Sequence, residues 1–150
     1  MILADTSAWV EYLRATGSPV HLRMRQLVGD AEELGVTEVV AMEILAGAGD
    51  DDHAVQLRRL LNRFELVAVE GLADYEAAAV LHRRCRQGGE TVRKLTDCLI
   101  AAVALRADAA ILHRDRDFDV IARYAPLKLA TLAERDRGRD AGRHRGATAG

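Results

Sequence analysis

Short apolar runs alternate with longer segments of helical periodicity along most of this chain. Five of the runs have the length of buried strands, and polar or turn-forming residues bound them. The expected strands cover residues 2–4, 34–36, 66–69, 109–112 and 127–130. Short strands that alternate with helices predict an α/β fold in which helices cover both faces of a central, mostly parallel sheet.

The segments between these strands predict helices. The clearest is 73–86, where Tyr75, Ala78, Ala79 and Leu81 suggest one apolar face and two glycines follow. The other expected helices cover residues 8–13, 19–31, 38–46, 52–64, 97–106 and 118–124, with Thr37 and Thr96 expected to cap two of them.

Length and composition favour one globular domain over residues 1–132, because 150 residues with 49% apolar content suit a single core. Residues 133–150 are rich in Arg, Gly and Asp without apolar periodicity, which predicts a disordered tail. No secretion signal and no run of about 18 apolar residues is visible, so we expect a cytoplasmic protein that does not enter a membrane. Cys85 and Cys98 lack metal-site spacing and are expected to be buried thiols in a reducing compartment.

The formal net charge of −2 is unevenly distributed. The tail carries five arginines against three acidic residues, which leaves 16 basic and 20 acidic residues in the body. A body of this charge does not attract nucleic acid as a whole. Any such partner must be held by local Arg or Lys groups, or through a bound cation.

Four carboxylates stand directly against apolar runs, where charge is costly unless something neutralises it. Asp5 follows the first strand, Asp115 follows the fourth, Asp97 opens an apolar helix, and Glu43 interrupts another. Ligand sites of parallel sheets lie beyond the carboxyl ends of the strands, so one rim could gather all four. Converging carboxylates repel one another, and a hard divalent cation is the usual remedy.

Each acid also has a simpler explanation when taken alone. Asp5 is an ordinary helix cap, and Asp97 is the kind of first-turn acid that a helix dipole favours. The acids between Asp115 and Asp119 could form a solvated turn. Glu43 is harder to explain in this way, because apolar residues surround it on both sides.

Together the four stretches resemble a known family. Ile2-Leu3-Ala4-Asp5-Thr6-Ser7-Ala8-Trp9, Ala41-Met42-Glu43-Ile44-Leu45-Ala46-Gly47, Thr96-Asp97-Cys98-Leu99-Ile100-Ala101-Ala102 and His113-Arg114-Asp115-Arg116-Asp117-Phe118-Asp119 are similar to motifs of the PIN-domain family. Within it the chain looks most like the VapC-type toxins of prokaryotic toxin–antitoxin pairs. The resemblance covers about residues 1–132 and implies a PIN-like three-layer α/β/α sandwich.

The resemblance implies a catalytic and metal-binding set of Asp5, Glu43, Asp97 and Asp115. Asp117 is a close rival to Asp115 as the fourth acid, because the last motif of the family varies in register. Thr6 matches a hydroxyl position beside the first acid. It could orient a carboxylate, water or substrate, or it could be no more than the cap of the next helix.

The chemistry that the resemblance implies is Mg²⁺- or Mn²⁺-dependent hydrolysis of an RNA phosphodiester. It also implies a homodimer and a cognate VapB-type antitoxin, for which the helices expected at 19–31 and 52–64 offer grooves. His113 is more simply a structural residue than a catalytic one.

Substrate contacts are expected from basic residues near the acids, namely Arg93, Arg114 and Arg116, with Lys94 as a further candidate. Only 4% of residues are aromatic, which disfavours base stacking and favours a structured RNA such as tRNA or rRNA. Two alternatives are a phosphatase with an Asp5 nucleophile, disfavoured by Ser7 where a second acid is needed, and a non-catalytic PIN-like RNA- or protein-binding module.

Overall fold

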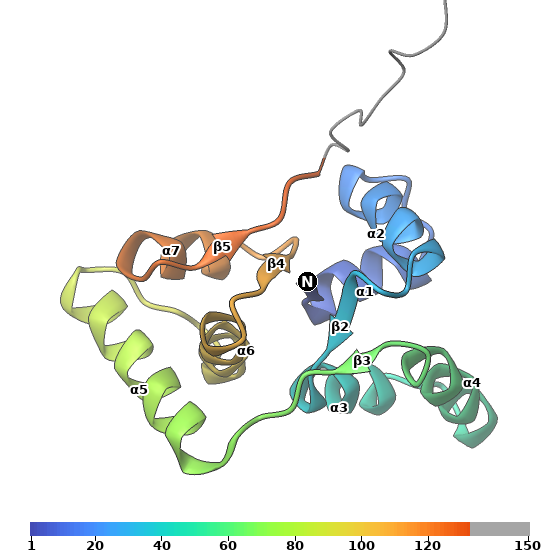
Figure 1. The fold of residues 1–150 in the computed structure, drawn as a ribbon, viewed down its shortest axis with the longest axis horizontal. Helices are drawn as coiled ribbons and strands as arrows, with labels where there is room; N and C mark the ends of the chain where they lie inside the picture. The colour runs from blue at the N-terminus through green and yellow to red at the C-terminus, as the bar shows by residue number, and fades with distance from the viewer. Residues whose placement is uncertain (133–150) are drawn as a thin grey trace, which may run out of the picture.

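A five-stranded parallel sheet forms the centre of the computed structural model, which describes residues 1–132 (Figure 1). Its strands lie in the order β3-β2-β1-β4-β5. They are β1 (Ile2–Ala4), β2 (Leu34–Val36), β3 (Glu65–Leu66), β4 (Ala110–Leu112) and β5 (Lys128–Leu129). The predicted α/β fold class and parallel sheet are confirmed. The tail predicted at 133–150 lies outside the described residues.

The strand expected at residues 66–69 is wrong in its extent. Val67 N still donates to Val36 O at 2.8 Å, but the backbone beyond it leaves the sheet. Arg106 Nη2 donates to Ala68 O at 2.6 Å, and Val69 N donates to Glu38 Oε2 at 2.8 Å. Side chains distant in sequence therefore satisfy the backbone groups that a longer strand would have paired.

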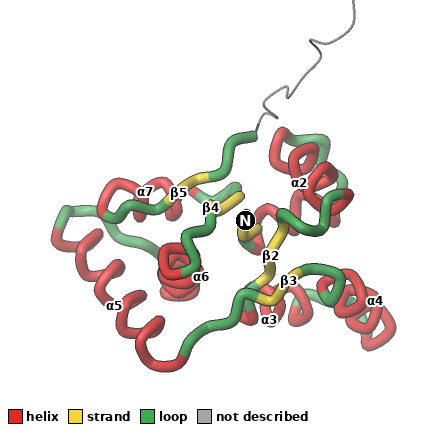
Figure 2. The backbone as a smooth tube through the Cα atoms, in the orientation of Figure 1, coloured by secondary structure: helices red, strands yellow, loops and turns green. Residues whose placement is uncertain are grey.

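Seven helices surround the sheet within the described residues (Figure 2). The helices α1 and α2 pack on each other, while α5, α6 and α7 form a second group on the other side of the view in Figure 1. Helix α3 contacts α1, α4 and α6 and so links the two groups. The bounds are α1 (Thr6–Leu13), α2 (Pro19–Gly29), α3 (Glu38–Ala46), α4 (Asp51–Leu61), α5 (Gly71–Gln87), α6 (Leu95–Arg106) and α7 (Arg116–Tyr124).

Two local predictions about these helices are wrong, and a third is confirmed in position only. Helix α6 begins one residue before Thr96 with Lys94 as its N-cap, so Thr96 caps nothing. Thr37 does occupy the N-cap of α3, but its hydroxyl donates to Glu38 Oε2 and caps no backbone N–H. Tyr75 is exposed, because the buried face of α5 runs instead through Asp74, Ala78, Leu81 and Cys85.

The core joins the central strands to α6, whose apolar run is buried almost throughout. Its largest fully buried side chains include Trp9, Leu3, Ile100 and Ile111. Cys85 and Cys98 are buried free thiols, as predicted. No helix among residues 1–132 combines the length and apolar character needed to cross a membrane.

The sheet order places a topological switch point between β1 and β4. Chain connections run from β1 towards β2 on one side and from β4 towards β5 on the other. A crevice opens at such a reversal, beyond the carboxyl ends of the two strands. Asp5 directly follows β1, and Asp115 lies three residues beyond β4.

Candidate metal centre

Asp5 is fixed at the switch point by both its backbone and its side chain. Its N–H donates to Leu112 O at 2.9 Å, which holds it beside the end of β4. Its carboxylate is the N-cap of α1, where Oδ2 accepts from Ser7 N at 2.9 Å and from Ser7 Oγ at 2.6 Å. The other oxygen, Oδ1, is buried and has no hydrogen-bond partner in residues 1–132. Helix capping therefore explains the position of Oδ2 but gives no partner to Oδ1.

Asp97 lies in the first turn of α6 and is only 3% exposed. Its Oδ2 is likewise buried without a hydrogen-bond partner among the described residues. Burial and the charges of Asp5 and Asp115 raise the pKa of Asp97 to about 8, although Lys94 opposes the shift. The carboxyl is thus held where ionisation is costly unless a cation arrives.

Asp5, Asp97 and Glu43 line one pocket of about 240 Å³, together with Thr6 and Lys94. Glu43 projects from the middle of α3, and its Oε1 accepts a hydrogen bond from Thr6 Oγ1 at 3.1 Å. The N-cap of α1 is Asp5, so the interpretation of Thr6 as a helix cap is wrong. Its hydroxyl orients a carboxylate instead.

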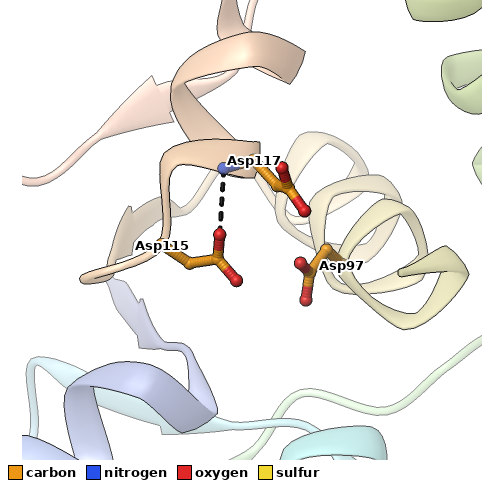
Figure 3. A group of neighbouring side chains, drawn as sticks. All are labelled: Asp97, Asp115 and Asp117. Atoms are coloured by element: carbon orange, nitrogen blue, oxygen red, sulfur yellow. Dashed lines mark hydrogen bonds between the residues drawn. The ribbon is translucent and has the colours of Figure 1, made fainter. Parts of the chain in front are cut away.

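Asp115 and Asp117 lie beside Asp97 and extend the acidic cluster (Figure 3). One carboxylate oxygen from each of the three residues lies within 4.8 Å of the others. Asp117 N donates to Asp115 Oδ1 at 3.0 Å, which ties the first turn of α7 to the preceding loop. Both rivals for the fourth acid are therefore near Asp97.

His113 braces this loop. Its Nδ1 accepts from Asp115 N at 3.0 Å, and its Nε2 lies 3.4 Å from Asp119 Oδ1. Its ring also packs against Phe118, with 5.2 Å between centroids. These contacts agree with the structural role expected of His113.

The side chains present fit a hard divalent cation. Unpartnered oxygens of two buried carboxylates, with further carboxylates around them, match the oxygen ligands that Mg²⁺ and Mn²⁺ prefer. A cation there would favour the ionised form of Asp97, which its surroundings otherwise disfavour.

The basic residues expected to contact substrate have different environments. Arg93 is paired with Asp115 and Asp117, each at 3.3 Å. Arg114 Nη1 lies 2.6 Å from Glu11 Oε1, and this side chain lines the acidic pocket. The side chain of Arg116 is exposed and makes no hydrogen bond or salt bridge with any residue of 1–132. It is the least constrained cation of the three.

Two polar residues at this site were missed in the sequence. Ser7 Oγ donates to Asp5 and accepts from Arg114 N at 2.9 Å, so it joins the loops after β1 and β4. Glu11 lines the acidic pocket, and hydrogen bonds from Thr16, Ser18 and Arg114 hold its pKa below the usual value. The position of Ser7 two residues after Asp5 hinted at a cap, whereas nothing local marked Glu11.

Comparison with protein families gives a match to the PIN domain over residues 2–124. Ribonuclease VapC11 of Mycobacterium tuberculosis is 51% identical over 133 residues, which cover 88% of this chain and 99% of the relative. Ribonuclease VapC51 of the same species is 27% identical over 121 residues, covering 80% of this chain and 84% of the relative.

Solved structures share the fold at lower sequence identity. The VapBC2 complex of Rickettsia felis, bound to a DNA fragment from its promoter, matches with a TM-score of 0.67 and 18% identity, covering 87% of this chain and 98% of the other. VapC20 of Mycobacterium tuberculosis, a toxin that cleaves the sarcin–ricin loop, matches with a TM-score of 0.61 and 20% identity, covering 85% and 99%.

Proposed function

The chain belongs to the PIN-domain family as a VapC-type ribonuclease toxin, and from this premise we propose that its carboxylate cluster holds a divalent cation and hydrolyses RNA phosphodiesters. The observation that carries the proposal is the pair of buried, unpartnered oxygens, Asp5 Oδ1 and Asp97 Oδ2. Oxygens buried in this way are costly in a protein without a role for them. A cation of double charge removes that cost for both.

Asp5 and Asp97 would be the principal metal ligands, with Glu43 and Asp115 completing the catalytic set and Asp117 as the alternative fourth acid. Mg²⁺ or Mn²⁺, when bound, supplies a nucleophile at neutral pH and offsets the charge that develops on the scissile phosphate. Thr6 keeps Glu43 oriented towards the pocket, and Ser7 does the same for Asp5. Lys94, at the rim of the pocket, provides positive charge for the incoming phosphate.

The substrate we propose is a structured RNA such as tRNA or rRNA, held by phosphate contacts from Arg114 and Arg116. Few aromatic residues are available for base stacking, which favours recognition of shape and backbone. The chain would act in the cytoplasm, where such RNAs occur, and as a homodimer.

A cognate VapB-type antitoxin is the protein partner that we propose. The groove of about 540 Å³ beside α1, α2 and α4 is lined by Tyr12, Leu13, His21, Arg25 and Leu60. Leu13 is exposed although it is apolar, and the groove suits the apolar side of a short antitoxin helix. Leu13→Asp should weaken antitoxin binding and leave RNA cleavage intact.

The test of the nuclease proposal is cleavage of end-labelled total RNA by purified protein with Mg²⁺, Mn²⁺ or EDTA. Wild type should cleave only with a divalent cation, whereas Asp5→Asn and Asp97→Asn should lose at least about 100-fold in rate, as expected when one component of the cluster is removed. Glu32→Gln removes an exposed negative charge elsewhere and should cleave normally.

Mapping the new 5′ ends after brief induction in cells would identify the RNA target. Cleavage that persists in EDTA would contradict the metal-dependent mechanism. RNA binding without cleavage at any metal concentration would support the non-catalytic alternative. Asp5→Ala should also abolish growth inhibition while it leaves antitoxin binding largely intact, and loss of both would indicate unfolding.

A further inference from the structure

A second pocket, of about 430 Å³, lies next to the acidic one at the loop between β4 and α7. Its walls include Arg114, Arg116 and Asp115 from this loop and its helix, and residues 18–20 at the start of α2. Arg114 lines both pockets, and Asp115 belongs to the acidic cluster as well as to the second pocket. The two cavities are thus neighbours that share the side chain of Arg114.

Two arginines of this second pocket, Arg114 and Arg116, offer guanidinium N–H groups to an anionic ligand. The pocket's two acidic side chains are already engaged: Asp119 with His113 Nε2, and Asp115 with Asp117 N and Arg93. The side chain of Arg116 has no hydrogen bond or salt bridge within residues 1–132. One nitrogen of Arg114 is paired with Glu11, and its other guanidinium N–H groups remain available.

We propose that this second pocket is a subsite for a non-scissile phosphate of the RNA, the one next to the phosphate that is cleaved. The inference rests on the proposed function, since it takes the acidic cluster as the cleavage site. When the scissile phosphate of an RNA strand lies at the acidic cluster, the next phosphate of the strand lies close to it. Arg114 lines both pockets and so can contact both phosphates. Arg116 is the principal contact, because arginine matches the geometry of a phosphate and this one is free to turn.

The first test replaces single phosphates of a cleavable RNA by neutral methylphosphonates. We expect wild type to lose about tenfold in kcat/KM when the phosphate next to the cleavage site is neutral. Arg116→Ala should lose about tenfold in kcat/KM on unmodified RNA. The neutral methylphosphonate next to the cleavage site should cause no further loss in this variant, whereas Arg116→Lys should recover part of the loss on unmodified RNA. Arg59→Ala, which removes an exposed arginine of α4, should behave like wild type.

The second test measures binding and does not depend on cleavage. In an Asp97→Asn background, Arg116→Ala should reduce the slope of log K against log salt by about 0.7, the value for one contact to a single strand. Arg116→Ala with an unchanged slope, or with the full methylphosphonate loss of wild type, would overturn the subsite. Failure of wild type to cleave RNA would instead contradict the nuclease proposal, and the binding slope would still decide about the subsite.

Discussion

Arg93 Nη2 lies 3.3 Å from Asp115 Oδ1, and the same guanidinium places Nε 3.3 Å from Asp117 Oδ2. The backbone N–H of Arg93 also donates to Asp117 Oδ2 at 3.2 Å. One residue of the loop between α5 and α6 therefore neutralises part of the acidic cluster that the loop after β4 contributes. The side chain of Arg93 is 66% exposed, whereas that of Asp117 is 2% exposed. The guanidinium of Arg93 therefore contacts the acidic cluster from its solvent side.

Arg93→Ala should destabilise the metal-free protein more than the metal-bound one. Without the guanidinium, three neighbouring carboxylates depend on an added cation for compensation. We expect the free energy of unfolding in EDTA to fall by about 1 kcal/mol, because the pair is largely exposed on the arginine side. A saturating concentration of Mg²⁺ should recover most of that loss. Urea denaturation under the two conditions measures both values.

Arg83→Ala, which removes an exposed arginine of α5, is the matched control. An equal loss for Arg93→Ala in EDTA and in Mg²⁺ would show that Arg93 has no compensating role in the cluster. That result would favour the role in substrate binding that the sequence predicts for Arg93.

The stability of the metal-free protein should fall as the pH rises from about 4 to 8. The pKa of Asp97 is about 8 in the folded state against an ordinary value of 3.8, so its protonated form is favoured by folding. The stabilisation is complete below pH 3.8 and is lost as the pH rises through the folded pKa. Asp97→Asn cannot ionise and should be more stable than wild type at pH 8 in EDTA, by roughly 2 kcal/mol.

Chemical denaturation at several pH values, with and without EDTA, measures this difference. Saturating Mg²⁺ should flatten the wild-type profile, because the cation stabilises the ionised carboxylate. Parallel profiles for wild type and Asp97→Asn in EDTA would mean that another group controls this region of pH.

The strands and the main acids could be predicted because their signals are local. Asp5 and Asp115 each follow a short buried run, and the carboxyl ends of neighbouring parallel strands meet at one rim. The extent of β3 could not be predicted in this way. The apolar run continues to Val69, but Arg106 and Glu38 take its backbone groups from far away in the sequence.

Contacts between loops limited what the sequence could indicate about the site. Ser7 and Arg114 are 107 residues apart, and no local pattern announces their hydrogen bond. Arg93 illustrates the same limit, since a basic residue near the acids predicts a substrate contact as readily as a pair with Asp115. The sequence therefore indicates which types of residue lie near the site, whereas the fold determines which of them already pair with one another.

Thr6→Ala should reduce the rate of RNA cleavage by roughly tenfold, because Glu43 loses the hydroxyl that orients it. Thr6→Ser keeps the hydroxyl and should retain most of the activity. Stability should change little, since the N-cap of α1 is Asp5. Single-turnover cleavage at several Mg²⁺ concentrations, with thermal unfolding of the same samples, tests this. Equal rates for Thr6→Ala and wild type would show that Glu43 needs no orientation by this hydroxyl.

Asp74 and Arg106 form an ion pair that we expect to stabilise the fold without serving the reaction. Arg106 Nε and Nη2 reach Asp74 at 3.1 and 3.0 Å, and Glu70 N donates to the same carboxylate at 2.8 Å. Asp74 is buried, so Asp74→Ala leaves Arg106 without its main partner and should cost about 3 kcal/mol at neutral pH. Cleavage at 25 °C should be unchanged, because neither residue lines the acidic pocket.

The pH dependence separates this pair from an ordinary packing contact. Burial raises the pKa of Asp74, but the hydrogen bonds from Arg106 and Glu70 outweigh it and hold the value below 3.8. Its contribution to stability is therefore present above about pH 4 and is lost as the pH falls through the folded pKa. The deficit of Asp74→Ala in urea denaturation should shrink between pH 5 and 2.5, whereas Glu76→Gln on the exposed side of α5 should match wild type throughout. A deficit independent of pH would assign the loss to packing.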